Sequence, residues 1–213
     1  MLRRMSTIAE RLGQLKSEIP KTKLIAVSKT KPVEDLVEAY QAGQRDFGEN
    51  YPNELKQKAA DAKLAELCPD LRWHFIGTLQ KKSLNHVLKA EKLVSIQTIT
   101  SLDMIDQIDK RLQAPLDVML QINTSREEQK GGFLEDDDVI KAIEHIGTKN
   151  FVKFQGLMTI GAAKNSKLSA ETGQDNPDFT RLVELKKVVS ERCNIEVICY
   201  FCTFYYQNLG FIN

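Results

Sequence analysis

The sequence predicts an α/β protein built as an incomplete (β/α)₈ barrel of the TIM type, with about six βα units and a divergent tail. Apolar runs of strand length alternate with helical patterns between residues 24 and 193, at about 28 residues per unit. The first run ends in Ser28-Lys29-Thr30, without the glycines of a dinucleotide-binding turn, and this favours a barrel over a doubly wound sheet. A complete barrel needs about 250 residues, so a chain of 213 residues is expected to lack nearly two units.

Six strands are predicted where short apolar runs end at glycine or polar residues. On the third of them, alternation places Trp73 and Phe75 on one face and His74 and Ile76 on the other. The predicted strands cover residues 24–28, 46–48, 73–77, 93–99, 118–122 and 154–160.

A helical pattern follows each predicted strand. Ser101 is a favourable N-cap for the fourth of these helices, and the fifth carries its acidic residues early, as the helix dipole favours. The predicted helices cover residues 33–42, 53–67, 81–89, 101–112, 135–146 and 178–193. Ahead of the first strand, Ile8, Leu12 and Leu15 share one face of a further amphipathic helix.

Composition narrows the classes of partner and compartment. Thirty Lys and Arg residues against 29 Asp and Glu leave a net charge of +1, so there is no electrostatic case for a nucleic acid or a membrane surface. Four cysteines are too few for a disulfide framework, and the start has no secretory signal, so we expect a cytoplasmic protein. Arg3, Arg4 and Arg11 leave a mitochondrial location as the alternative.

The end of the sequence differs from the rest, so we divide the chain into a domain of residues 1–195 and an aromatic tail of residues 196–213. The last 17 residues contain no Asp, Glu, Lys or Arg and hold six of the 15 aromatic residues. They could form a buried strand or a membrane-associated tail, although Gln207 and Asn208 interrupt the apolar run. We favour a third interpretation, a spliced or frame-shifted end of different origin.

Lys29 is the leading candidate for chemistry. It follows the first predicted strand, and barrels place their functional residues at the carboxyl ends of their strands. A lysine amine screened from water can attack an aldehyde to form an imine, whereas a solvated lysine at a strand end is the plainer alternative. Asn50 and Met158 also end strands, where they could contact a ligand or belong to a turn and the core. The three histidines lack metal-ligand spacing, so no metal site is predicted.

Five segments, in order, resemble the pyridoxal phosphate homeostasis protein family, the single-domain relatives of alanine racemase. The segments are AVSKTKP at residues 26–32, FGENY at 47–51, WHFIG at 73–77, QINTS at 121–125 and GLMTIG at 156–161.

The resemblance implies a fold-type III barrel that holds pyridoxal 5′-phosphate (PLP) as an aldimine of Lys29. It implies that Asn50, Ile76 and Met158 line the cofactor. It also implies a monomeric carrier rather than an enzyme, one that limits free aldehyde and supplies PLP-dependent apoenzymes. Catalysis of a racemase-like or aldolase-like reaction through the same amine is the alternative.

The sequence departs from the family in several places, including Pro52, Thr78, Arg126 and the end of the chain. Arg126 stands where the family usually has glycine, and residues 197–213 match none of the later segments that bind the phosphate. We therefore expect a C-terminally truncated form with weakened phosphate binding. A non-binding truncated product is the remaining alternative.

Overall fold

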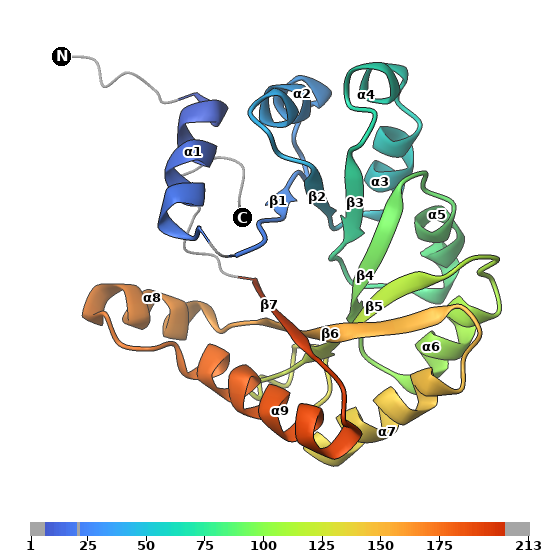
Figure 1. The fold of residues 1–213 in the computed structure, drawn as a ribbon, viewed down its shortest axis with the longest axis vertical. Coiled ribbons are helices and arrows are strands. Elements are labelled where there is room, and N and C mark those ends of the chain that lie inside the picture. Colours follow the sequence, from blue (N-terminus) through green and yellow to red (C-terminus); the bar gives the residue numbers. More distant parts are fainter. Residues whose placement is uncertain (1–6, 21, 203–213) are drawn as a thin grey trace.

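The computed structural model describes residues 7–20 and 22–202, and within them one parallel sheet curls into most of a barrel. Each strand pairs in parallel with the next strand along the chain, so the order in the sheet is the order in the sequence. The helices lie mainly on the outer side of the curve (Figure 1). The strands are β1 (Ala26–Val27), β2 (Asp46–Glu49), β3 (Arg72–Phe75), β4 (Leu93–Ile99), β5 (Leu116–Ile122), β6 (Val152–Ile160) and β7 (Ile198–Cys202).

The helices are distributed between these strands, after a first helix that precedes the sheet. That first helix buries Ile8, Leu12 and Leu15, as predicted. The helices are α1 (Ile8–Glu18), α2 (Val33–Gln41), α3 (Pro52–Ala59), α4 (Ala62–Leu67), the 3₁₀ helix η1 (Lys81–Ser83), α5 (Leu84–Leu88), α6 (Leu102–Asp109), α7 (Asp136–Gly147), α8 (Ala163–Thr172) and α9 (Pro177–Cys193).

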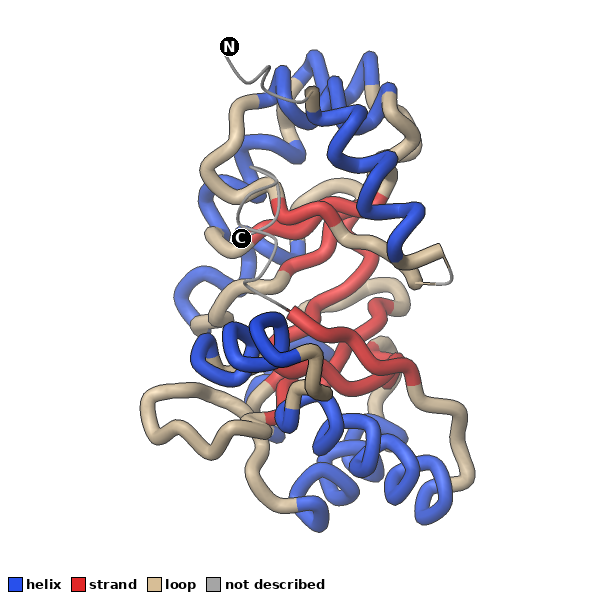
Figure 2. Tube along the Cα trace, turned by 90° about the vertical axis from the view of Figure 1, so that its left-hand side faces the viewer, coloured by secondary structure: helices blue, strands red, loops and turns tan. Residues whose placement is uncertain are grey.

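The sheet does not close within the described residues, because β1 and β7 are its two edges rather than neighbours. Figure 2 turns this open side toward the viewer, with the strands between two groups of helices. The prediction of an incomplete α/β barrel is therefore confirmed.

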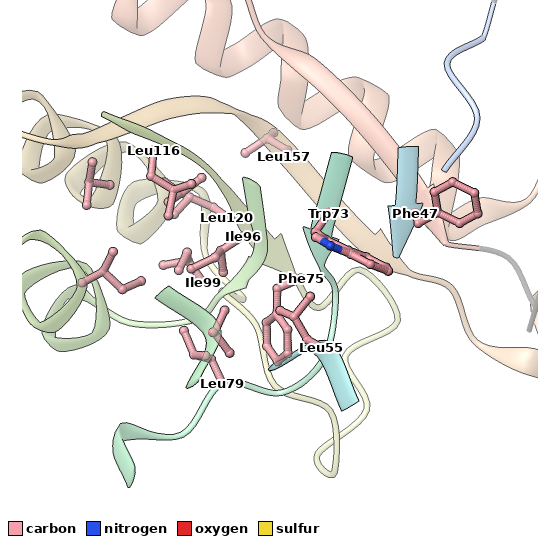
Figure 3. Close-up of a cluster of buried hydrophobic side chains, with 14 of the residues drawn as sticks. Phe47, Leu55, Trp73, Phe75, Leu79, Ile96, Ile99, Leu116, Leu120 and Leu157 are labelled. Carbon is pink, nitrogen blue, oxygen red and sulfur yellow. The ribbon is translucent and has the colours of Figure 1, made fainter. Parts of the chain in front are cut away.

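The hydrophobic core lies between the outer face of the sheet and the helices. Phe47 of β2 and Trp73 of β3 contact each other with ring centroids 6.2 Å apart, and Leu55 of α3 is fully buried with them (Figure 3). Burying a side chain of this size stabilises the fold by about 1.5–3 kcal/mol. This packing joins β2 to β3 and buries α3 against the outer face of the sheet.

Two helical predictions need correction. The single helix predicted over residues 53–67 is two helices, because Asp61 caps the start of α4 by accepting a hydrogen bond from the Leu64 amide at 3.0 Å. Helix α8 was not predicted. Its only buried residue is Ser166, so the sequence carries no apolar stripe to reveal it.

Part of the aromatic tail forms the seventh strand. Residues 198–202 pair with β6 and form one edge of the sheet within the described residues, with Ile198 45 % exposed. The rest of the predicted tail, residues 203–213, lies outside the described residues. In the part of the chain that the structure covers, no helix is long and apolar enough to cross a membrane.

Candidate functional site

Lys29 lies in the turn that follows β1, at the carboxyl end of the first strand. The preceding Ser28 directs its hydroxyl to the Glu49 carboxylate, on the side of the strand where α3 packs. Alternation then places Lys29 on the opposite, inner side of the sheet. Its side chain is half-buried, and its Nζ makes no hydrogen bond or ion pair with any described residue. The position leaves this amine available to a ligand in the barrel.

Asn50 follows β2, the strand next to β1, and Ile76 follows β3, one strand farther along the sheet. Val27 pairs with Gly48, and Glu49 pairs with Phe75. Extending these registers past the strand ends brings Lys29, Asn50 and Ile76 to one level. The structure therefore brings three of the four predicted cofactor-binding residues together.

The Asn50 side chain at this rim has an unused acceptor. Its Oδ1 is buried and has no hydrogen-bond partner among the residues that the structure describes. The exit of β3 lies close against it, because a Cβ added to Gly77 would stand 1.8 Å from the Asn50 carbonyl oxygen. Only glycine permits this approach. An unpaired buried acceptor costs free energy, which a ligand that donates a hydrogen bond would recover.

Met158 lies three strands farther along the sheet, on β6. It is 2 % exposed, and its register partners are Gln121 of β5 and Tyr200 of β7. The structure does not place it next to the other three residues, and its contact with a cofactor stays a prediction.

A buried polar network lies behind Lys29, and the sequence did not predict it. Lys58 of α3 donates hydrogen bonds to the Ser28 carbonyl oxygen at 2.6 Å, Glu49 Oε1 at 2.8 Å and Glu54 Oε1 at 2.7 Å. Glu54 Oε1 also accepts from the Thr30 amide at 2.6 Å. Burial raises the pKa of the Glu49 carboxyl, although the hydrogen bond from Lys58 opposes the shift. We call these five residues the turn network.

Two features of the sequence could have revealed part of the turn network. Glu49 shares a strand face with Phe47, where an apolar residue is expected, and Glu54 and Lys58 have the i,i+4 spacing of a helical ion pair. Nothing local links either pair to Ser28 and Thr30, which precede them by about 20–30 positions in the chain.

A second polar cluster lies at the other end of the same strands. His74 Nε2 lies 2.8 Å from Asp46 Oδ1, and its Nδ1 lies 2.7 Å from the Ser95 hydroxyl. Arg72 donates two hydrogen bonds to Asp46. Burial would raise the pKa of Asp46, but hydrogen bonds from His74 and Arg72 outweigh it and hold that pKa well below its usual value. His74 is thus a hydrogen-bonded structural histidine, and we call these four residues the amino-end cluster.

The described residues give little support for metal-dependent or disulfide chemistry. They contain no group of three or more His, Cys, Asp and Glu side chains that could hold a metal ion. Cys68, Cys193 and Cys199 are free thiols. A groove of about 400 Å³ adjoins the rim next to Asn50, between Tyr51, Thr78 and Lys82.

Known proteins resemble this chain over most of its length. A family model described as "Alanine racemase, N-terminal domain" matches residues 4–200. A pyridoxal phosphate homeostasis protein of Mus musculus is 41% identical over 181 residues, covering 82% of this chain and 64% of its own. One of Schizosaccharomyces pombe is 39% identical over 201 residues, covering 90% of this chain and 80% of its own. The chain spans less than two-thirds of the mouse and human proteins.

Solved structures agree on the fold. PipY of Synechococcus elongatus without PLP has a TM-score of 0.74 at 28% identity, covering 92% of this chain and 87% of its own. PipY with PLP bound has a TM-score of 0.67 at 30% identity, covering 87% of this chain and 84% of its own. The resemblance drawn from the five segments is confirmed: this chain belongs to the pyridoxal phosphate homeostasis protein family and carries the fold of the alanine racemase N-terminal domain.

Proposed function

We propose that this chain binds pyridoxal 5′-phosphate reversibly through Lys29 and acts as a carrier of the cofactor in vitamin B6 homeostasis. The observation that carries the proposal is the position of Lys29, half-buried at the carboxyl end of β1 with its amine unpaired among the described residues. Two findings on relatives support it. PipY has been solved with PLP bound, and the curated relatives are named for homeostasis of this cofactor.

The residues at the rim fit such a ligand. The aldehyde of the cofactor supplies a carbon to which an unprotonated lysine amine adds, with loss of one water. Lys29 Nζ provides the amine, and Ile76 offers an apolar side chain at the same level of the rim, two strands away. Asn50 Oδ1, buried without a partner, can accept a hydrogen bond from the ligand.

We propose a carrier rather than an enzyme because Glu49 and Glu54, the acids of the turn network behind Lys29, accept hydrogen bonds from other groups. Glu49 accepts hydrogen bonds from Ser28 and Lys58, and Glu54 accepts from Lys58 and the Thr30 amide. A racemase-like or aldolase-like reaction needs an acid or base within reach of the reacting carbon. A carrier needs only the amine, and its recipients would be PLP-dependent apoenzymes.

The phosphate group is expected to contribute little to binding by this chain. Two charge-assisted hydrogen bonds to a phosphate would stabilise it by about 3–6 kcal/mol, or about two to four powers of ten in affinity. Residues 197–213 carry no Lys or Arg that could supply such contacts. We therefore propose that pyridoxal, which lacks the phosphate, binds within about tenfold of pyridoxal phosphate.

The test is reduction with borohydride after incubation with pyridoxal phosphate, followed by peptide mapping. We expect the pyridoxyl label on Lys29, and the Lys29→Ala variant should lose the yellow absorbance. The matched control is Lys31→Ala, two residues farther along the same segment, which should keep both signals. A label spread evenly over the lysines, or a chromophore unchanged in Lys29→Ala, would refute the proposal.

A further inference from the structure

Lys58 is the central donor of the turn network and lies almost entirely inside the protein. The residue is 7 % exposed, and its ammonium group donates to one backbone carbonyl and two carboxylates. A buried lysine is rare unless it is paired, and two of the three hydrogen bonds of Lys58 lead out of α3, to the Ser28 carbonyl oxygen after β1 and to Glu49 at the end of β2. Lys58 therefore connects α3 to the rim of the sheet.

The turn network attaches to the backbone on both sides of Lys29. The Ser28 carbonyl oxygen accepts from Lys58, and the Thr30 amide donates to Glu54. Thr30 has a φ of 60°, a left-handed conformation that β-branched residues rarely adopt. A turn held in this conformation needs contacts that specify it, and the hydrogen bond from the Thr30 amide to Glu54 is one.

Stability alone gives a poor account of this arrangement. Glu49 is fully buried, yet its Oε2 has no hydrogen-bond partner within residues 7–20 and 22–202. Two carboxylates share one ammonium, so the turn network carries an excess of negative charge if all three groups are ionised. Buried ion pairs of this kind are often no better for stability than apolar side chains of the same size, and some of them specify a single conformation instead.

We propose that Lys58 is a positioning residue for Lys29: with Glu49 and Glu54 it holds the backbone on both sides of the amine, so that the amine faces the ligand in the barrel. The inference rests on the proposed function of Lys29 as the binding amine. Lys58 itself lies on the α3 side of the sheet and does not touch the ligand.

The test compares stability with the rate of labelling at Lys29. The variant Glu49→Leu/Lys58→Met replaces both members of the buried pair by apolar side chains, a change that is often neutral for stability. We expect its unfolding midpoint to stay close to that of the unchanged chain. The rate of borohydride-trapped labelling at Lys29, relative to Lys31 in the same sample, should fall by about tenfold to a hundredfold with pyridoxal phosphate as the probe.

Two further variants complete the design. Lys56→Met removes an exposed lysine of the same helix and should leave the labelling ratio unchanged. Glu54→Ala removes a partly exposed side chain and frees the Thr30 amide, so it should lower the ratio by a smaller factor. If the double variant fails to fold, Glu54→Ala decides the question.

The outcomes separate the two proposals. Labelling scattered over the lysines of the unchanged chain would refute the function of Lys29 itself. Selective labelling of Lys29 in the unchanged chain, with an equal ratio in a folded double variant, would leave that function standing and overturn the role of Lys58. An unchanged ratio in Glu54→Ala, where the double variant does not fold, would overturn it as well.

Discussion

The turn network and the amino-end cluster occupy opposite ends of the first strands and differ in how completely their polar groups are paired. In the amino-end cluster, both carboxylate oxygens of Asp46 accept hydrogen bonds and both ring nitrogens of His74 are paired, all between side chains. The turn network leaves Glu49 Oε2 without a partner among the described residues and directs two of its hydrogen bonds to the backbone on either side of Lys29. A buried cluster whose hydrogen-bonding groups are all paired stabilises a fold. A cluster with an unpaired group beside a reactive amine indicates a functional site instead.

The largest expected effect is on the free energy of unfolding, and it distinguishes the amino-end cluster from the turn network. Asp46→Ala removes the acceptor shared by Arg72 and the buried His74, and we expect it to lower the free energy of unfolding by about 3–5 kcal/mol in urea denaturation. The folded fraction should still be labelled selectively at Lys29. The matched control is Asp70→Ala, which breaks an exposed pair with Arg45 and should cost less than about 1 kcal/mol. Equal losses in the two variants would contradict the stabilising role of Asp46.

A smaller effect is expected at the rim. Gly77→Ala forces a methyl group against the Asn50 carbonyl oxygen, so the backbone must shift and we expect a loss of about 1–3 kcal/mol. Selective labelling of Lys29 should weaken with it. Gly147→Ala, at the end of α7, is the control, because nothing lies within 4 Å of the Cβ that it adds. If both variants label like the unchanged chain, Asn50 has no part in the site.

The pH dependence of stability should also come from the amino-end cluster. Burial lowers the pKa of His74 despite the hydrogen bond to Asp46, so below its ordinary value of 6.5 the unfolded state binds a proton that the folded state does not. Stability is then complete above about pH 6.5 and falls as the pH drops, by at most about 1.4 kcal/mol per unit. His74→Gln should flatten this limb when unfolding is followed from pH 7 to pH 5. An equally steep limb in that variant would assign the effect to another group.

The sequence predicted the sheet better than the site. The regular alternation of apolar runs and helical patterns located six of the strands to within a few residues, because each run had to be buried between neighbours on both sides. Asp61 was overlooked as a helix cap, so α3 and α4 were predicted as one helix. A strand at Ile198–Cys202 was only one of the structures that the aromatic tail allowed. Its run of aromatic residues has no periodicity that would distinguish a strand from the alternatives.

Some residues of the site could be predicted from the sequence and others could not. Lys29, Asn50 and Ile76 could be predicted because each follows the end of its strand, and parallel strands end at one edge. The contacts of Lys58 could not, because they join α3 to residues far away in the sequence. Arg126 adopts a φ of 52°, a left-handed conformation that glycine reaches without strain, and this agrees with the glycine that the resemblance led us to expect there.

The sequential order of the strands has a consequence for how the protein is made. Each strand after the first meets a partner that has already left the ribosome, at a separation of about 20–45 residues, so the sheet can grow at its newest edge during synthesis. The first three strands, with Lys29 and the rim beside it, are complete by residue 77. A pulse of vitamin B6 aldehyde given to ribosome-bound chains of increasing length would show at which length Lys29 is first labelled in preference to other lysines.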